Sequence, residues 1–352
     1  MKQIPLILLG AGGVGQALLR QIVAGRAMTA ARNRLRLNVV AVADSRSWRM
    51  ATGGLADEAL HALLAAKTAG QPVGDSRPGA ADIVAAVHAA GVRDAILVDA
   101  TAEAGLEPAL NQALTLNYGV VLANKKALAG PWATAQRYFN NPRLRHESTV
   151  GGGQPVIATL RYLLDTNDPI LRIEGQLSGT LGYICSQLDE EIPFSRALMA
   201  ARAQGFTEPD PREDLGGEDV MRKVLILARM AGWPLEAADI PVESLYPAEL
   251  ASLSVDAFML ASPTLDAALQ ARVAAAQAVG NVLRYTAVVE EGQAAVGLQP
   301  VPANSPLAHL KYVSFRTGRY DDEALLIGGK GAGVEMTAAG VLGDIIALAR
   351  AS

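Results

Sequence analysis

A run of glycines near the amino terminus has the spacing of a phosphate-binding turn. Residues 10–15 read Gly-Ala-Gly-Gly-Val-Gly and fit G-x-G-x-x-G, between an apolar, strand-like run at 4–9 and a helix-compatible segment at 14–25. In that setting the glycines allow a tight turn, a close approach of the backbone to a pyrophosphate, and close packing of helix on strand. The motif predicts dinucleotide binding, and a purely structural glycine turn is the alternative. The predicted binding residues are Gly10, Gly12, Gly13, Val14 and Gly15.

The end of the next predicted strand, 37–43, carries two residue types that recognise different dinucleotides. Asp44 would accept hydrogen bonds from the adenosine ribose hydroxyls of NAD. Arg46, helped by Arg49, would pair with the 2′-phosphate of NADP, unless it is simply a solvated loop charge. The sequence therefore leaves both NAD and NADP open as cofactors.

Two later predicted strands, 95–99 and 119–122, are also followed by polar residues, Thr101 and Lys125. Ligands of open α/β sheets bind outside the carboxyl ends of the strands, so both residues are predicted to border the nicotinamide half of the cofactor. A lysine there could hold a carboxylate or polarise a carbonyl. Read alone, Lys125 and Lys126 would instead be an ordinary pair of surface lysines.

The most highly charged segment is 205–223, where nine of nineteen residues are charged. Its prolines and glycines exclude a continuous helix, so 208–214 is predicted to be loop, with a helix starting near Glu218. Asp219 and Lys223 then lie four residues apart on one helix face, which is either a surface ion pair or part of a site. In an amino-acid site, Lys223 and Asp219 would handle a proton. Glu208 and Asp214 would bind the substrate ammonium.

A third group consists of small residues at 178–183, after a strand-like run at 171–177. Gly179 allows a close backbone approach, and Thr180 supplies a hydroxyl at a helix start. Cys185 follows, and a thiol nucleophile would suit an acylating aldehyde dehydrogenase. Because none of the four histidines lies in a recognisable partner motif, Cys185 is predicted to be a small buried apolar residue.

The elements that must position these residues follow two patterns. Through residue 122, strand-like runs alternate with helical segments, including 55–67, 80–90 and 106–117, which predicts a doubly wound parallel sheet. From Glu147 the pattern becomes that of a second, α+β domain. It has a helix near 155–164, strand-like runs at 284–289 and 311–315, and helices at 218–231 and 264–279. The tail from 337 to 351 is again helical.

Composition restricts the classes of partner. The chain has 352 residues, 31 Lys+Arg against 35 Asp+Glu, and a formal net charge of −4, with no dense basic stripe. We therefore expect a small-molecule ligand rather than nucleic acid or a membrane surface. The apolar run at the amino terminus is too short for a signal peptide, and no stretch approaches a membrane span. A single cysteine fits a reducing setting, so a cytoplasmic location is expected.

Several segments, in order along nearly the whole chain, resemble homoserine dehydrogenases. The 205–223 block is the most specific of them, and the glycine fingerprint is the least. The matching segments are 10–15, 124–127, 146–155 (HESTVGGGQP), 178–184 (SGTLGYI), 205–211 with 219–223, and 331–333 with 337–341.

The resemblance implies reversible NAD(P)H-dependent reduction of L-aspartate 4-semialdehyde to L-homoserine, a step towards threonine and methionine. It implies that Lys223 and Lys125 flank the reacting centre and that Asp219 supports Lys223. Glu208 and Asp214 would hold the substrate's amino end, and Thr180 and Gly179 would line the pocket.

Other implications concern architecture. The resemblance implies a Rossmann domain at 1–146 completed by 334–352, a substrate and dimerisation domain at 147–333, and a homodimer. The C-terminal helix would return to the first domain, with Gly340 at the cofactor. A sodium ion would be bound at 147–154, or that segment is only a tight turn crossing between domains. The implied sodium ligands are Glu147, Val150, Gly152 and Gln154.

The chain also departs from its relatives. It ends at Ser352, so neither a regulatory nor a kinase domain is expected; Phe206 replaces a common tyrosine, and 303–317 lacks the Gly and Asn often seen after Pro306-Leu307-Ala308. Two other functions remain open: a related oxidoreductase acting on another small amino or oxo acid, and a catalytically silent nucleotide sensor.

Overall fold

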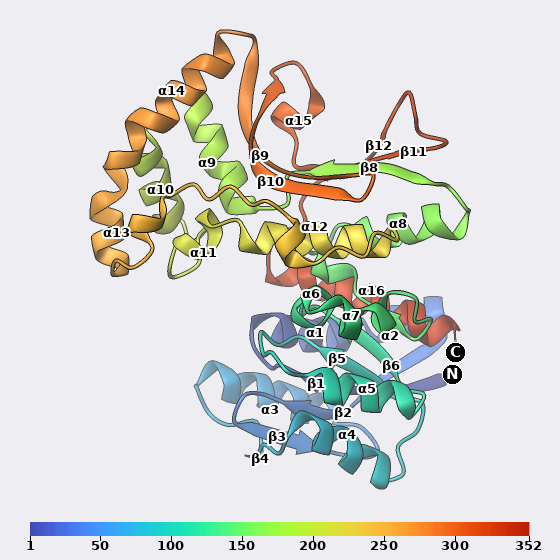
Figure 1. Ribbon diagram of the computed structural model, residues 1–352. Helices are drawn as coiled ribbons and strands as arrows, with labels where there is room; N and C mark the ends of the chain where they lie inside the picture. Colours follow the sequence, from blue (N-terminus) through green and yellow to red (C-terminus); the bar gives the residue numbers. More distant parts are fainter. Residues whose placement is uncertain (352) are drawn as a thin grey trace. The chain divides into compact units, whose positions relative to one another are not determined.

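The computed structural model describes residues 1–351 and divides the chain into two compact units (Figure 1). Unit 1 joins Met1–Ile157 to the C-terminal segment from Lys330, and unit 2 spans Ala158–Gly329. Helix α8 (Val156–Asp165) crosses the boundary. No helix in the described part of the chain is both long enough and apolar enough to cross a membrane.

Unit 1 contains a seven-stranded sheet in the order β4-β3-β2-β1-β5-β6-β7. Strands β2, β1, β5, β6 and β7 are parallel, and β3 and β4 add an antiparallel edge beside β2. The order reverses at β1, which pairs with β2 on one side and β5 on the other. In such sheets the ligand crevice forms at this switch point. The strands are β1 (Lys2–Leu9), β2 (Leu35–Ala43), β3 (Ser47–Met50), β4 (Asp75–Ser76), β5 (Ile96–Asp99), β6 (Gly119–Leu122) and β7 (Leu144–Arg145).

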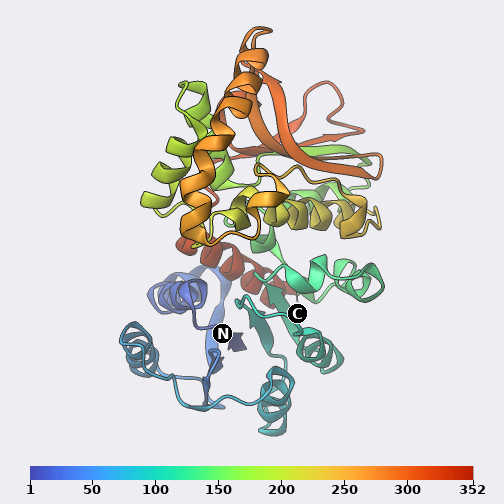
Figure 2. The ribbon, with the colours of Figure 1, turned by 60° about the vertical axis from the view of Figure 1, so that its left-hand side comes forward.

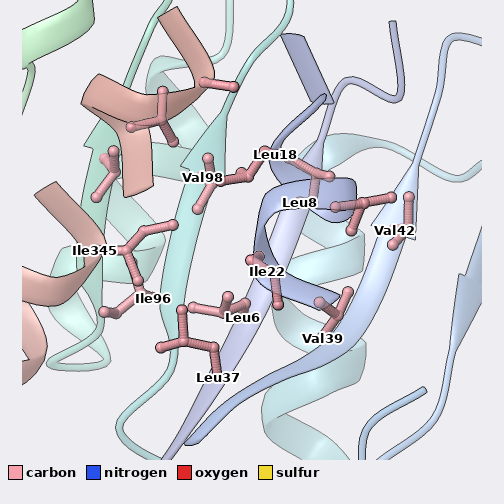
Figure 3. Packing of buried hydrophobic residues seen from close by; sticks show 14 of the residues in the cluster. Leu6, Leu8, Leu18, Ile22, Leu37, Val39, Val42, Ile96, Val98 and Ile345 are labelled. Carbon is pink, nitrogen blue, oxygen red and sulfur yellow. The ribbon is translucent and has the colours of Figure 1, made fainter. Parts of the chain in front are cut away.

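Apolar residues of the strands form the core of unit 1 together with two helices. Leu6 on β1, Leu18 on α1 and Ile345 on α16 are each at most 1% exposed, and Figure 3 shows their side chains converging on the sheet. Burying a side chain of this size contributes about 1.5–3 kcal/mol. The helices are α1 (Gly13–Ala24), α2 (Arg26–Asn33), α3 (Asp57–Thr68), α4 (Ala80–Ala89), α5 (Glu107–Thr115), α6 (Lys126–Ala129), α7 (Trp132–Phe139) and α16 (Val334–Ala351).

The C-terminal helix α16 returns to the Rossmann sheet, as predicted. Glu335 at its start accepts hydrogen bonds from Arg20 (3.0 Å) and Gln21 (3.0 Å) of α1. Near its end, Lys2 Nζ of β1 donates to the carbonyl of Ala349 at 3.1 Å. The first and last segments of the chain therefore share one core.

Unit 2 contains a five-stranded antiparallel sheet in the order β10-β9-β8-β11-β12. Strands β9 and β10 form a hairpin whose two turn residues, Glu291 and Gly292, both have positive φ, as the twist of a two-residue hairpin requires. Helices α9, α12 and α14 pack against β9, and Figure 2 shows the orange helix α14 beside the hairpin. The strands are β8 (Ile170–Gly175), β9 (Asn281–Glu290), β10 (Gln293–Pro302), β11 (Tyr312–Thr317) and β12 (Leu325–Gly328). The helices are α9 (Gly179–Asp189), α10 (Phe194–Ala203), α11 (Arg212–Leu215), α12 (Glu218–Met230), α13 (Val255–Ala261), α14 (Asp266–Gln277) and α15 (Pro306–His309).

The predicted fold class, a Rossmann sheet followed by an α+β domain, is confirmed. One local prediction is wrong: 208–214 is not loop throughout, because the short helix α11 begins at Arg212. Pro211 is the N-cap of α11, where no intrahelical hydrogen bond needs its missing N–H. A proline is therefore compatible with the start of this helix, although it would disrupt a helix interior.

Candidate active site

The glycine turn of unit 1 has the geometry of a nucleotide cradle. Gly10 has φ +99° and lies so close to the backbone of Ala100 that an added Cβ would stand 2.6 Å from the Ala100 carbonyl carbon. An added Cβ at Gly15 would overlap the Gly10 carbonyl oxygen, whereas one at Gly12 would meet nothing within 4 Å. Gly10 and Gly15 are therefore required by close backbone packing, whereas Gly12 borders open space.

The start of helix α1 leaves donors available beside that space. Gly12 is its N-cap, and no side chain caps the helix. The first N–H groups of a helix lack partners within the helix and favour an anion such as a pyrophosphate. Gly13 lies beside the Val334 side chain, 3.3 Å from the place a Cβ would occupy. The turn and helix start thus fit a dinucleotide.

Asp44, which follows β2, already accepts four hydrogen bonds within unit 1. Its Oδ1 accepts from the N–H groups of Arg46 (2.8 Å) and Ser47 (2.7 Å) and from the Ser47 hydroxyl (3.0 Å). Its Oδ2 accepts from Lys67 Nζ at 2.7 Å, and these side chains are only 7% and 17% exposed. Burial would raise the pKa of Asp44, but the bonds from Lys67 and the two backbone groups outweigh it and hold the pKa far below its usual value.

The basic residues near Asp44 are placed differently. Lys67 lies in the last turn of α3 and is partly buried against the carboxylate, whereas Arg46 is exposed. Lys67 was not predicted as a site residue. It is 23 positions from Asp44, and no local motif signals that the two will meet.

The ends of β5 and β6 are joined by a polar network. The Thr101 hydroxyl donates to Asp99 Oδ1 at 2.7 Å, and Asn124 Nδ2 donates to the same hydroxyl at 3.2 Å. Asn124 Oδ1 also accepts from the Lys126 N–H, which fixes the turn that carries Lys125. Burial raises the pKa of Asp99 to about 6, against opposing hydrogen bonds from Thr101 and Asn124. Thr101 and Lys125 therefore stand at one edge of the sheet, on a turn fixed by side chains that sequence reasoning missed.

In unit 2, Lys223 is held at the start of helix α9. Its Nζ lies 2.6 Å from Asp219 Oδ2, one turn earlier on α12, and donates to the carbonyl of Leu177 at 2.6 Å. The Lys223 side chain is 17% exposed and that of Asp219 is 47% exposed. The ammonium is therefore oriented by a carboxylate and a backbone carbonyl. The sequence could not single out the Leu177 carbonyl, because every residue has a backbone carbonyl.

Thr180, three residues after the Leu177 carbonyl that Lys223 contacts, forms a hydrogen bond with Asp214. The Thr180 hydroxyl donates to the Phe206 carbonyl (2.5 Å) and lies 2.9 Å from Asp214 Oδ1. Asp214 Oδ2 accepts from the backbone N–H of Glu208 at 2.8 Å. Burial raises the pKa of Asp214, although the Glu208 and Thr180 hydrogen bonds oppose the shift. Asp214 thus fixes the backbone that presents Glu208.

Segment 147–154, assigned to sodium by resemblance, is packed within unit 1. Gly152 has φ +62°, and a Cβ there would overlap the Gly331 carbonyl. Glu147 Oε1 accepts from the Ile157 N–H at 2.8 Å, so part of that carboxylate caps α8. Among residues 1–351, no group of three or more His, Cys, Asp or Glu side chains could hold a metal. A site here would therefore depend on carbonyls such as that of Val150 and on Gln154.

Two further positions have a packing explanation. A Cβ at Gly340 would overlap the Ser148 hydroxyl, so this glycine lets α16 approach segment 148–152. Cys185 is buried, as predicted, and burial raises the pKa of its thiol to about 11. The cysteine is therefore not a thiolate nucleophile at neutral pH.

The sheet order and the glycine turn of unit 1 define a dinucleotide-binding Rossmann unit, and unit 2 is a separate α+β unit. Residues 10–144 match the family model described as homoserine dehydrogenase, NAD binding domain, and residues 155–346 match homoserine dehydrogenase. The chain belongs to the homoserine dehydrogenase family.

Two members of this family and one solved structure illustrate the similarity. A bifunctional aspartokinase/homoserine dehydrogenase 2 of Zea mays is 38% identical over 97% of this chain, which covers 38% of that protein. A homoserine dehydrogenase of Emericella nidulans is 37% identical over 75% of this chain and 78% of its own. A crystal structure of a Candida auris protein of unknown function aligns with a TM-score of 0.87 at 32% identity, covering 99% of both chains. The chain spans well under half of the length of the first of these relatives.

Proposed function

We propose that the chain interconverts L-aspartate 4-semialdehyde and L-homoserine with a nicotinamide dinucleotide. The observation that carries the proposal is the cluster in unit 2, where the ammonium of Lys223 contacts Leu177 O three residues before Thr180. Thr180 in turn contacts Asp214. Residues 177–180 therefore contact both the proposed proton donor, Lys223, and one proposed partner of the substrate's ammonium, Asp214.

The cofactor would supply or accept hydride at the carbonyl carbon. In the reducing direction, Lys223 would donate a proton to the carbonyl oxygen as the aldehyde becomes a primary alcohol. An ammonium poised at that oxygen stabilises the negative charge as it develops. Asp219, 2.6 Å from Nζ, orients the ammonium. Lys125 is proposed as the second lysine at the reacting centre, next to Thr101 at the nicotinamide.

Glu208 and Asp214 would bind the substrate's ammonium. Both oxygens of Asp214 already accept hydrogen bonds, so its main contribution is negative charge and the placement of Glu208. Gly179 and Thr180 would line the same pocket.

The environment of Asp44 supports NADP as the preferred dinucleotide. An NAD-binding acid must offer free oxygens to two ribose hydroxyls, yet Asp44 has three donors on Oδ1 and Lys67 on Oδ2. A 2′-phosphate would instead meet the ammonium of Lys67 and the exposed guanidinium of Arg46. We propose NADP over NAD on this ground.

The remaining proposals rest on the family resemblance and on composition. They are a homodimer, a sodium ion at segment 147–154, a cytoplasmic location, and no nucleic acid or membrane partner. Sedimentation of the purified chain tests the first, because a dimer would have twice the 36.7 kDa mass of the chain.

The activity is tested by following absorbance at 340 nm with L-homoserine and either NADP or NAD, and with aspartate semialdehyde in reverse. A panel of other small hydroxy amino acids and hydroxy acids separates this function from that of a related oxidoreductase. Turnover restricted to homoserine supports the proposal. Turnover of another member alone would replace it, and silence in both directions would favour a nucleotide sensor.

A further inference from the structure

Lys311 is a lysine for which the proposed reaction has no role, and its amine lies beside the start of helix α9. Its Nζ donates to the carbonyl of Gly179 at 3.3 Å. Its aliphatic stem crosses α9 at Gly182, where an added Cβ would lie 2.9 Å from Lys311 Cε. Glycine at position 182 therefore leaves the space that the Lys311 side chain occupies.

The backbone around Lys311 is fixed to the same place. Gln176 Nε2 donates to the Leu307 carbonyl at 2.7 Å, and the Gln176 N–H donates to the Tyr312 carbonyl at 3.2 Å. Residues on both sides of Lys311 are thus tied to the residue that follows β8. Leu310 and Lys311 are the two residues that connect α15 to β11.

The charge of Lys311 is not matched by the protein. Within residues 1–351, no carboxylate lies within salt-bridge distance of its amine, and the long bond to Gly179 is its one hydrogen bond. Burial lowers the pKa of Lys311, although the residue as a whole stays accessible to solvent. A partly desolvated ammonium with unused donors favours an anion.

The position relative to the other site residues identifies that anion. Lys223 contacts the Leu177 carbonyl, and Lys311 contacts the Gly179 carbonyl. These two carbonyls belong to residues two positions apart, at most about 7 Å along the chain. The next residue, Thr180, contacts Asp214. A four-carbon amino acid separates its carboxylate from its terminal oxygen by a comparable span. Lys223 is assigned to that oxygen and two acids to the ammonium, which leaves the carboxylate without an assigned partner in unit 2.

We propose that Lys311 binds the α-carboxylate of the amino acid substrate. The inference rests on the proposed function and completes its substrate specificity. Lys311 would make the enzyme select amino acids over amino alcohols, and would act on binding rather than on the transfer of hydride.

The test compares L-homoserine with 3-amino-1-propanol, which is homoserine without its carboxylate, in wild-type and Lys311→Met protein. Loss of one charge-assisted contact is expected to raise the homoserine KM about 10- to 100-fold, with kcat changed far less. The wild-type preference for homoserine over the amino alcohol should shrink by a similar factor. Lys311→Arg should keep most of that preference, because it retains the cation.

Arg316→Met is the matched control, since it removes an exposed cation from the neighbouring strand β11, away from segment 177–180. Lys311→Gln gives a second uncharged variant if the methionine variant is insoluble. An unchanged preference in the folded uncharged variants, with wild type active on homoserine, would overturn the role of Lys311 alone. Wild type inactive on homoserine would overturn the proposed function and the carboxylate assignment with it.

Discussion

Replacing Lys67 by methionine tests whether the Asp44 pocket selects NADP. In the structure, Lys67 Nζ lies 2.7 Å from Asp44 Oδ2, and both side chains are largely buried. The ammonium would serve the 2′-phosphate while neutralising a carboxylate that would otherwise repel it. Methionine keeps most of the length and apolar volume of the stem, so the change is mainly one of charge.

The expected magnitude follows from one charged contact. A charge-assisted hydrogen bond is worth about 1.5–3 kcal/mol, so the KM for NADP should rise roughly 10- to 150-fold. The KM for NAD should stay constant or fall, because Asp44 Oδ2 becomes free for a ribose hydroxyl. Initial rates with saturating homoserine and varied NADP or NAD give both constants.

Arg26→Met is the matched control. Arg26 forms a partly buried ion pair of unit 1 with Asp57, and it donates to the Leu37 carbonyl on β2. Its loss should lower stability without changing the ratio of the two KM values. If Lys67→Met changed the constants for NADP and NAD by the same factor, the proposed role of the Asp44–Lys67 pair in selecting NADP would be refuted.

Two predictions concern stability. The pKa of Asp99 rises from 3.8 to about 6 on folding, so its contribution is complete below pH 4 and is lost as pH rises through 6. The free energy of unfolding in urea should therefore fall by about 3 kcal/mol in wild type as the pH rises through this interval, but not in Asp99→Asn. Parallel pH dependences of the two proteins would contradict this role of Asp99. Gly217→Ala should cost about 2–4 kcal/mol, because Gly217 has φ +74° and a Cβ would overlap the Tyr285 hydroxyl. Gly205 has φ +70° but an added Cβ would meet nothing within 4 Å, so Gly205→Ala should show the cost of backbone strain alone. If Gly217→Ala and Gly205→Ala lowered the free energy of unfolding equally, the steric contribution proposed for Gly217 would be refuted.

The parts of the fold that could be predicted are those with local signals. The glycine turn and the alternating strands and helices of unit 1 follow from periodicity and from residues that only one geometry accommodates. Strand β10 gave no such signal, because it contains Gly297, Pro300 and Pro302. It lies at the edge of its sheet, where prolines are tolerated, and it is held by pairing with β9.

The candidate site divides in the same way. Residues in dense motifs, such as Asp214 and Lys223, could be selected from their type and spacing. Lys67 and Lys311 could not, because each becomes part of a site only when a distant segment folds against it. The Leu177 carbonyl is a backbone group whose role depends entirely on the side chain that reaches it.

The most direct test measures turnover and cofactor affinity together in Lys223→Ala. Removing an ammonium that protonates the reacting oxygen should lower kcat by about 10²- to 10⁴-fold, with the dinucleotide Kd, from nicotinamide fluorescence, unchanged within about threefold. Arg222→Ala is the control, since it removes the neighbouring residue's ion pair with Glu218 on the same helix, and it should leave both quantities near wild type. Full turnover in Lys223→Ala, or an equal loss of rate and cofactor affinity, would contradict the role of Lys223 as proton donor.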